Sequence, residues 1–282
     1  MVICPVRKRG AFSMTISINN YNQAVNSTQN AISTSIKRIS TGSQYNSPSD
    51  GAAAYSILAR MYSNIDTNAT QTSNAQNSSA MLSTAADGIT STMSELDNMR
   101  SSLTDLLNSP TGSSRFQQTN KAISDSISQV DALGSSVQFN GKALLNGTQS
   151  TTVSNGSGGY ASVAMPNLTS EALGLTDKNG KSTLDLSSKE GIQKALDTVS
   201  NAYDTALSAA TSLGAAQQNL TYSAANSTTT AENLTSAAST MGDTDIAKEV
   251  TKLKSAQTQN AFALFATKIN DHNRGAALAL LQ

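Results

Sequence analysis

Apolar residues recur at helical spacing near both ends of this chain. Between residues 17 and 40 they follow one another at steps of three, four and seven positions, the pattern of an amphipathic helix with a narrow apolar face. A similar pattern begins near residue 246 and continues to the last residues. The members of these stripes are Ile18, Tyr21, Val25, Ile32, Ile36 and Ile39 near the start, and Ile246, Val250, Leu253, Leu264, Phe265, Leu278 and Leu281 near the end.

The two terminal stripes need a partner, because an apolar helix face is unfavourable in water. The simplest arrangement pairs the two ends of the chain as antiparallel helices and leaves apolar surface for neighbouring molecules. The alternative is a self-contained four-helix bundle that buries all of these side chains within one molecule.

Long helical patterns also fill most of the chain between the termini. The first helix ends near Gly42, and the next begins near Ser49 or Asp50 and stops before the turn-rich residues 108–112. A further helix carries residues 116–133. The helical pattern returns at Lys189 and lasts to Gly242. The last helix then starts with Asp243 or Thr244 as its expected N-cap.

Residues 137–186 have a different character, because glycine is frequent and helical periodicity is lost. Asn-Gly dipeptides at Asn140, Asn146 and Asn155 are typical of tight hairpins. Short strands are expected around residues 151–153, 160–165 and 183–186.

These patterns predict a mainly α fold: a long antiparallel coiled coil or helical bundle with paired N- and C-terminal helices and a small β-hairpin patch in the middle of the chain. Residues 14–45 and 246–282 are predicted to form an inner coiled-coil domain. Residues 46–245 are predicted to form an outer helical shell domain, whose β-rich tip covers about 137–186.

The first 13 residues do not share the pattern of the rest. Their basic residues, Arg7, Lys8 and Arg9, follow the apolar ones, whereas a secretory signal has the opposite order. Met14 opens the periodic region, so we expect residues 1–13 to be a non-native leader and the native protein to start at Met14 or Thr15. Intact mass spectrometry of the native protein tests this.

Composition and charge exclude several classes of function. The chain has 19 basic and 19 acidic residues, so no charge excess points to nucleic acid. It has no tryptophan, and no apolar run is long enough to span a bilayer. Cys4 is the only cysteine and His272 the only histidine, which leaves too few ligands for a His/Cys zinc site. No sequence motif of a hydrolase, P-loop or dinucleotide-binding protein occurs. We therefore expect no enzyme activity and no cofactor.

Several stretches in a fixed order resemble bacterial flagellin. The resemblance extends almost continuously from Met14 to Gln282. It is carried by Ile36-Lys37-Arg38-Ile39-Ser40-Thr41-Gly42, by Asp50-Gly51-Ala52-Ala53, by Gln138-Phe139-Asn140-Gly141 with Leu144-Leu145, by Asp245-Ile246-Ala247-Lys248-Glu249, and by Leu278-Ala279-Leu280-Leu281-Gln282. The large variable outer domains of many flagellins are absent.

The resemblance implies a structural subunit of the extracellular flagellar filament, used for swimming. Such subunits are exported unfolded by the flagellar type III apparatus without a cleaved signal, and they polymerise under a cap with their paired terminal helices lining an inner tube. The implied partners are further copies of the chain, an export chaperone, the filament cap and the hook-junction proteins.

The resemblance also places Leu96, Met99, Arg100 and Leu103 in the region read by the animal innate receptor for flagellin. Asn98 and Ser101 depart from the family's pattern there, so ordinary helix-surface ion pairs of Arg100 are the alternative.

Two other functions remain open at this point. A hook–filament junction protein would be related at its ends and similar in length. A soluble coiled-coil signalling or adhesin module would lack the pairing of the termini.

Overall fold

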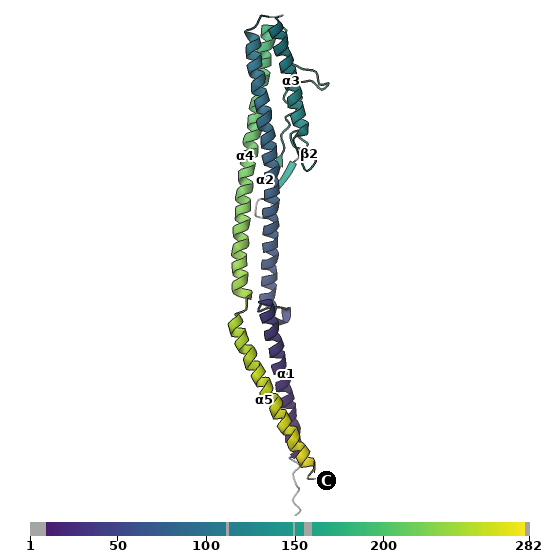
Figure 1. The fold of residues 1–282 in the computed structure, drawn as a ribbon, viewed down its shortest axis with the longest axis vertical. Helices are drawn as coiled ribbons and strands as arrows, with labels where there is room; N and C mark the ends of the chain where they lie inside the picture. Colours follow the sequence, from purple (N-terminus) through teal and green to yellow (C-terminus); the bar gives the residue numbers. More distant parts are fainter. Residues whose placement is uncertain (1–9, 111–112, 149, 155–159, 280–282) are drawn as a thin grey trace, which may run out of the picture. The chain divides into compact units, whose positions relative to one another are not determined.

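The computed structural model describes residues 10–110, 113–148, 150–154 and 160–279, and it confirms a mainly α fold. The elements in chain order are α1 (Gly10–Thr41), the 3-10 helix η1 (Pro48–Asp50), α2 (Ala52–Leu107), α3 (Ser114–Ser136), β1 (Gln138–Phe139), β2 (Lys142–Ala143), β3 (Ser150–Ser154), β4 (Tyr160–Ala164), α4 (Lys189–Gly242) and α5 (Ile246–Ala279). The helices account for most of the ribbon in Figure 1.

The helices end where the sequence predicts, with one correction. Gly42 follows α1 with a φ of 69°, which a residue with a side chain rarely adopts. Ser113 caps α3, since its side chain accepts a hydrogen bond from the Phe116 amide. The prediction of Asp243 or Thr244 as the N-cap of α5 is wrong. Asp245 holds that position, and its carboxylate accepts a hydrogen bond from the Lys248 amide at 3.0 Å.

The predicted Asn-Gly turn at Asn140 is confirmed. Asn140 and Gly141 have φ values of 51° and 75°, as a two-residue hairpin between β1 and β2 requires. The second pair, β3 and β4, is antiparallel with Ser150 opposite Ala164, close to the predicted strands. The dipeptide at Asn155 lies outside the described residues.

The strand predicted around residues 183–186 is wrong. The segment has no regular secondary structure. The Thr183 amide donates to the Leu175 carbonyl, but two later amides bond to local side chains: the Leu184 amide donates to Ser182 and the Ser187 amide donates to Asp185. Such local side-chain bonds compete with a ladder, so only an isolated bridge between Thr176 and Ser182 remains.

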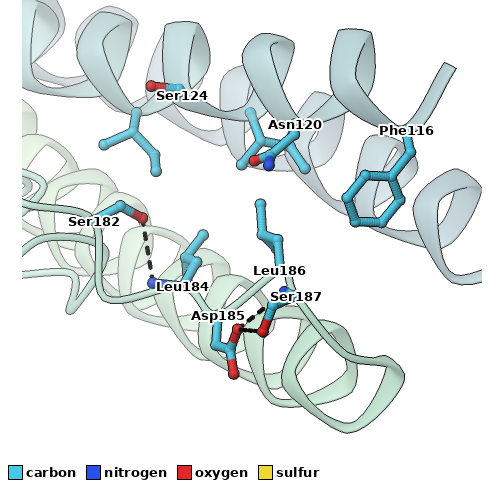
Figure 2. Close-up of a pocket in the computed structure, with 10 residues that line it drawn as sticks. Phe116, Asn120, Ser124, Ser182, Leu184, Asp185, Leu186 and Ser187 are labelled. Carbon is cyan, nitrogen blue, oxygen red and sulfur yellow. Dashed lines mark hydrogen bonds between the residues drawn. The ribbon is translucent and has the colours of Figure 1, made fainter. Parts of the chain in front are cut away.

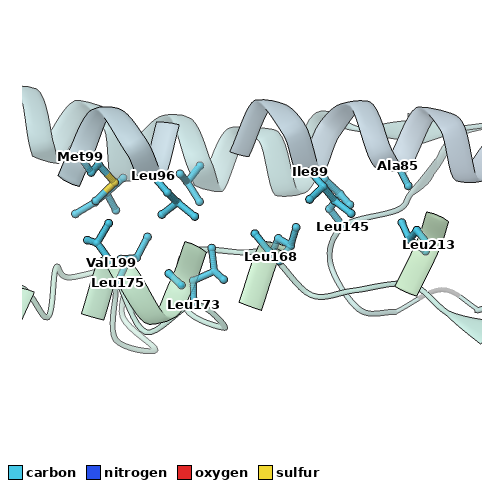
Figure 3. Packing of buried hydrophobic residues seen from close by; sticks show 14 of the residues in the cluster. Ala85, Ile89, Leu96, Met99, Leu145, Leu168, Leu173, Leu175, Val199 and Leu213 are labelled. Carbon is cyan, nitrogen blue, oxygen red and sulfur yellow. The ribbon is translucent and has the colours of Figure 1, made fainter. Parts of the chain in front are cut away.

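The chain forms two compact units. One unit comprises residues 65–232 and holds the main hydrophobic core. Figure 3 shows side chains of α2, among them Ile89, Leu96 and Met99, facing leucines of the irregular segments and Val199 of α4. Gly88 permits this close approach, since a Cβ there would lie 2.8 Å from side-chain atoms of both Val137 and Leu145.

The other unit comprises residues up to Asn64 and from Asn233 onward. It contains α1 and α5, which lie side by side (Figure 1). The division predicted at residues 45 and 246 between an inner and an outer domain stays a prediction.

Candidate assembly surface

The pairing of α1 and α5 follows a coiled-coil pattern of burial. On each helix the buried and half-buried residues recur at alternating steps of three and four, which places them on one face. We call this face the seam. Its members are Val25, Thr28, Ile32, Ser35 and Ile39 on α1, and Glu249, Leu253, Ala256, Asn260, Ala263, Thr267 and Asn270 on α5.

The most buried part of the seam is a cluster of polar and charged groups around Glu249. The Glu249 side chain is only 5% exposed. One of its oxygens accepts a hydrogen bond from Ser35 at 2.8 Å and lies 3.8 Å from the Arg38 guanidinium. The other oxygen accepts from Lys252 at 2.9 Å. Two helices therefore supply the groups that neutralise one buried carboxylate.

The electrostatics of this cluster favour the ionised form of Glu249. Burial raises the pKa of this carboxyl, but the hydrogen bonds from Lys252 and Ser35 and the charges of Lys252 and Arg38 outweigh burial. The pKa of Glu249 therefore lies below its usual value, so the buried group remains a carboxylate at neutral pH.

A second polar contact joins the helices further along the seam. The Asn260 amide group donates to the Thr28 hydroxyl at 2.9 Å and to the Val25 carbonyl at 3.4 Å. Ala256 lies between the two polar contacts on α5 and is buried.

The connectors at one end of the pair are tied together by the backbone. The Gln44 amide donates to the Gly242 carbonyl at 2.7 Å, and the Thr244 amide donates to the Gly42 carbonyl at 2.8 Å. Arg38 joins this connection to the seam, because its Nε donates to the Gln44 carbonyl at 3.1 Å. These hydrogen bonds hold the residues that follow α1 beside the residues that precede α5.

Large apolar side chains remain exposed outside the seam. We call these residues the outer apolar surface: Ile36 on α1, and Ile246, Val250, Phe262, Leu264, Phe265 and Ile269 on α5. Phe262 and Phe265 are 69% and 64% exposed. With 3.6 residues per turn, Phe262, Phe265 and Ile269 project on the side of α5 away from the seam. No movement of α1 along the seam would cover them.

The two phenylalanines line a shallow groove along α5. Its lining residues are Lys254, Gln257, Thr258, Ala261, Phe262 and Phe265. A groove with aromatic side chains, a small residue and a flanking cation suits contact with another helix.

The residues predicted to make polymer contacts divide into three groups. Val25, Ile32, Ile39 and Leu253 are half-buried in the seam, whereas Ile36, Ile246, Val250, Leu264 and Phe265 are exposed. The side chains of Ile18, Tyr21 and Leu278 and the whole of Leu281 lie outside the described part of the chain. The role of all these residues in polymer contacts stays a prediction.

Sequence reasoning missed Glu249, Ser35, Phe262 and Ile269. Phe262 and Ile269 lie on a different face of α5 from the apolar stripe that the sequence predicts. The signal for Glu249 was its position seven residues before Ala256, but a search for apolar positions passes over a charged residue.

The candidate receptor region is mostly buried. Leu96, Met99 and Leu103 have no exposed surface and belong to the core of the 65–232 unit. Arg100 is exposed, pairs with Asp97 at 3.4 Å and lies over the Tyr203 ring at 5.8 Å. Recognition by a receptor stays a prediction, and only Arg100 of these four could be touched while the unit is folded.

A second hollow lies between α3 and the extended segment before α4 (Figure 2). Leu184 and Leu186 point from this segment toward α3, and Phe116 closes one end. Its one carboxylate, Asp185, accepts hydrogen bonds from the Ser187 hydroxyl and amide, which hold its pKa below the usual value. A single locally satisfied carboxylate is not arranged for acid–base chemistry.

Over the part of the chain that the structure describes, no group of three His, Cys, Asp or Glu side chains could hold a metal ion. Across the same residues, no helix has the length and apolar character needed to cross a bilayer. His272 is exposed on α5.

Comparison with known proteins agrees with this arrangement. Residues 12–150 match the bacterial flagellin N-terminal helical region, and residues 196–278 match the bacterial flagellin C-terminal helical region. The phase 2 flagellin of Salmonella abortus-equi is 26% identical over 64% of this chain and 35% of its own length. The flagellin of Serratia marcescens is 23% identical over 63% of this chain and 53% of its own length.

The chain thus spans about a third of the length of the Salmonella relative and about half of the Serratia one. Among solved structures, a crystal structure of Bacillus cereus flagellin aligns with a TM-score of 0.48 and 17% identity, over 55% of this chain and 88% of that one. The N- and C-terminal family models lie in the expected order on the two halves of the helical framework, and the chain belongs to the bacterial flagellin family.

Proposed function

We propose that this chain is a structural subunit that polymerises with copies of itself into an extracellular flagellar filament for swimming, and that it is not an enzyme. The observation that carries the proposal is the outer apolar surface. Phe262, Phe265 and Ile269 face away from α1, so neither helix of the terminal pair can bury them.

Contacts between identical subunits account for this surface. An apolar face that packs against a different face of the next copy makes a head-to-tail contact, which gives a helical polymer when the symmetry does not close. Fully burying a large apolar side chain contributes about 1.5–3 kcal/mol. The residues of the outer apolar surface are already partly covered, so each would add about half of that. Summed over the residues of the outer apolar surface, this adds several kcal/mol to the stability of each contact between copies.

Family membership also supports the remaining parts of the proposal. The chain would leave the cell unfolded through the flagellar type III apparatus, with an export chaperone on its way and the filament cap and hook-junction proteins as later partners. The α5 groove is a suitable surface for such helical contacts, since it holds two exposed aromatic side chains.

Electron microscopy of the purified full chain after addition of ammonium sulfate tests the polymer. Sulfate strengthens apolar burial, so we expect helical filaments about as wide as flagella. The double variant Phe262→Ser, Phe265→Ser should lose assembly while keeping its helicity. The matched control is Tyr222→Ser, which removes an aromatic side chain that is 65% exposed on α4, and it should assemble. A wild-type chain that stays monomeric at high concentration and high salt, or a double variant that assembles normally, would contradict the proposal.

A further inference from the structure

The apolar part of the seam does not define one register of α1 against α5. Val25, Ile32 and Ile39 are seven residues apart. Opposite them, α5 presents mainly small or polar seam residues, such as Ala256 and Ala263. A slip by seven residues moves one helix by about 10 Å along the other and places similar side chains opposite one another again.

The charged cluster breaks this repetition. In the observed register, Glu249 meets Ser35 and Arg38. Seven residues earlier on α1, the equivalents of Ser35 and Arg38 are Thr28 and Ala31. After such a slip the buried carboxylate would face a hydroxyl and a methyl group, with no cation from α1.

A slip in the other direction also leaves the Glu249 carboxylate without a cation from α1. The equivalents of Ser35 and Arg38 are then Gly42 and Tyr45, which lie beyond the end of α1. The remaining charged groups around Glu249 do not replace Arg38. Lys248 and Lys252 belong to α5 itself, and Asp243 and Asp245 line the same small pocket with negative charge.

We propose that Glu249 is a register lock: its burial between Ser35 and Arg38 of α1, together with the backbone connection at Gly42 and Thr244, selects one axial register of the terminal helix pair from several that the apolar seam accepts. The lock acts through the loss of the α1 partners: in every slipped register the buried carboxylate keeps Lys252, which belongs to α5, but loses the Arg38 cation, so its charge is less well compensated. A single polar residue in a coiled-coil seam can set register in this way at some cost in stability. The lock concerns pairing within one chain and does not depend on polymerisation.

The register can be measured as a distance between spin labels in the full chain with Cys4→Ser. Ser33 on α1 and Lys268 on α5 are exposed and lie far apart along the pair, so a seven-residue slip changes their separation by about 10 Å. The measurement is made on the isolated chain and on salt-treated protein diluted with unlabelled chain. We expect one distance for the wild type in whichever state the pair is ordered.

The decisive variant is Glu249→Leu, which keeps an apolar side chain in the seam and removes the charge. We expect a second distance about 10 Å from the first, with helicity retained. The variant Gln259→Leu adds the same side chain to an exposed site of α5 and should keep one distance. The double variant Glu249→Leu, Arg38→Leu leaves neither charge unpaired and should also show more than one register.

Three results would overturn the lock. The first is a broad distance distribution for the wild type in both states. The second is a single unchanged distance in both Glu249→Leu and the double variant. The third is loss of helix pairing in both variants, which would mean that Glu249 supplies stability and not register. Filament formation is observed separately by microscopy, so a failure to polymerise leaves the distances interpretable.

Discussion

The two units of this chain are built from similar helices but are held together differently. The 65–232 unit buries large aliphatic side chains completely, among them Leu82, Ile89 and Leu96 of α2. Among the residues of the α1–α5 pair whose burial the structure describes, those buried most deeply are Ser35, Glu249 and Ala256, and the aliphatic seam residues are only half-buried. One unit is therefore stabilised by its own apolar core, whereas the other has apolar surface left to bury.

This difference separates stability from assembly. The core of the 65–232 unit accounts for its stability within one chain, because each buried aliphatic side chain contributes about 1.5–3 kcal/mol. Under the proposed function, the terminal pair would complete its burial against neighbouring subunits. In the proposed register lock, the polar seam sets the register of the pair in the state in which the pair is ordered.

The largest effect should come from the core. Leu96→Ala removes a side chain with no exposed surface and leaves a cavity, so we expect a loss of about 2–5 kcal/mol in the free energy of unfolding. Ile32→Ala, at a half-buried seam position, should cost clearly less in the isolated chain. Urea unfolding of both variants measures this, and equal losses would contradict the contrast between the two units.

Protease sensitivity should also separate the two units. Helices of this length with many Ser, Thr, Asn and Gln residues depend on packing for stability. We therefore expect residues 14–45 and 246–282 to be cleaved quickly in the isolated chain and protected in the assembled state. The 65–232 unit should resist in both states.

Limited proteolysis with mass mapping of fragments checks this expectation. Equal protection of both ends before and after assembly would mean that the terminal pair is already fully folded. Removal of residues 278–282 tests the tail in the same experiment, because unchanged assembly would exclude it from the contacts.

Acid should weaken the terminal pair through Glu249. Its folded pKa is lowered, so the stabilisation is fully present above its ordinary pKa of about 4.5 and is lost as the pH falls through the lower folded value. We expect the spin-label distance to broaden over that range, while Glu249→Gln should remove most of this pH dependence. The core of the 65–232 unit holds uncharged side chains, so its unfolding should respond less. A wild-type titration identical to that of Glu249→Gln would contradict this account.

The same contrast explains what the sequence could predict. Long apolar repeats predicted the helices and the pairing of the termini, and Asn140-Gly141 predicted a hairpin, because these features depend on local periodicity and backbone conformation. The polar centre of the seam was not predicted, since nothing local distinguishes Glu249 from a solvated glutamate. Its burial depends on Ser35 and Arg38, which lie more than 200 residues away in the chain.

The failures near helix α5 and residues 183–186 have a related cause. At the start of α5 three neighbouring side chains are candidate caps, and in residues 183–186 local side chains compete with strand pairing for the same backbone amides. The Thr244 amide donates to the Gly42 carbonyl in the connector and the Thr244 hydroxyl is buried without a hydrogen-bond partner, whereas the Asp245 carboxylate accepts from the Lys248 amide and caps the helix.

The smallest expected effect concerns this cap. Asp245→Ala removes the hydrogen bond to the Lys248 amide and a negative charge near the positive end of the helix dipole, which should cost about 1 kcal/mol in the stability of α5. Because α5 belongs to the terminal pair, the loss should appear as faster amide exchange in its first turns, while the 65–232 unit stays unchanged. Asp204→Ala, in the middle of α4 where no cap exists, should be neutral or slightly stabilising. If Asp245→Ala leaves exchange at the start of α5 unaltered, the backbone connection between Gly42 and Thr244 is sufficient to begin the helix, and the carboxylate is dispensable.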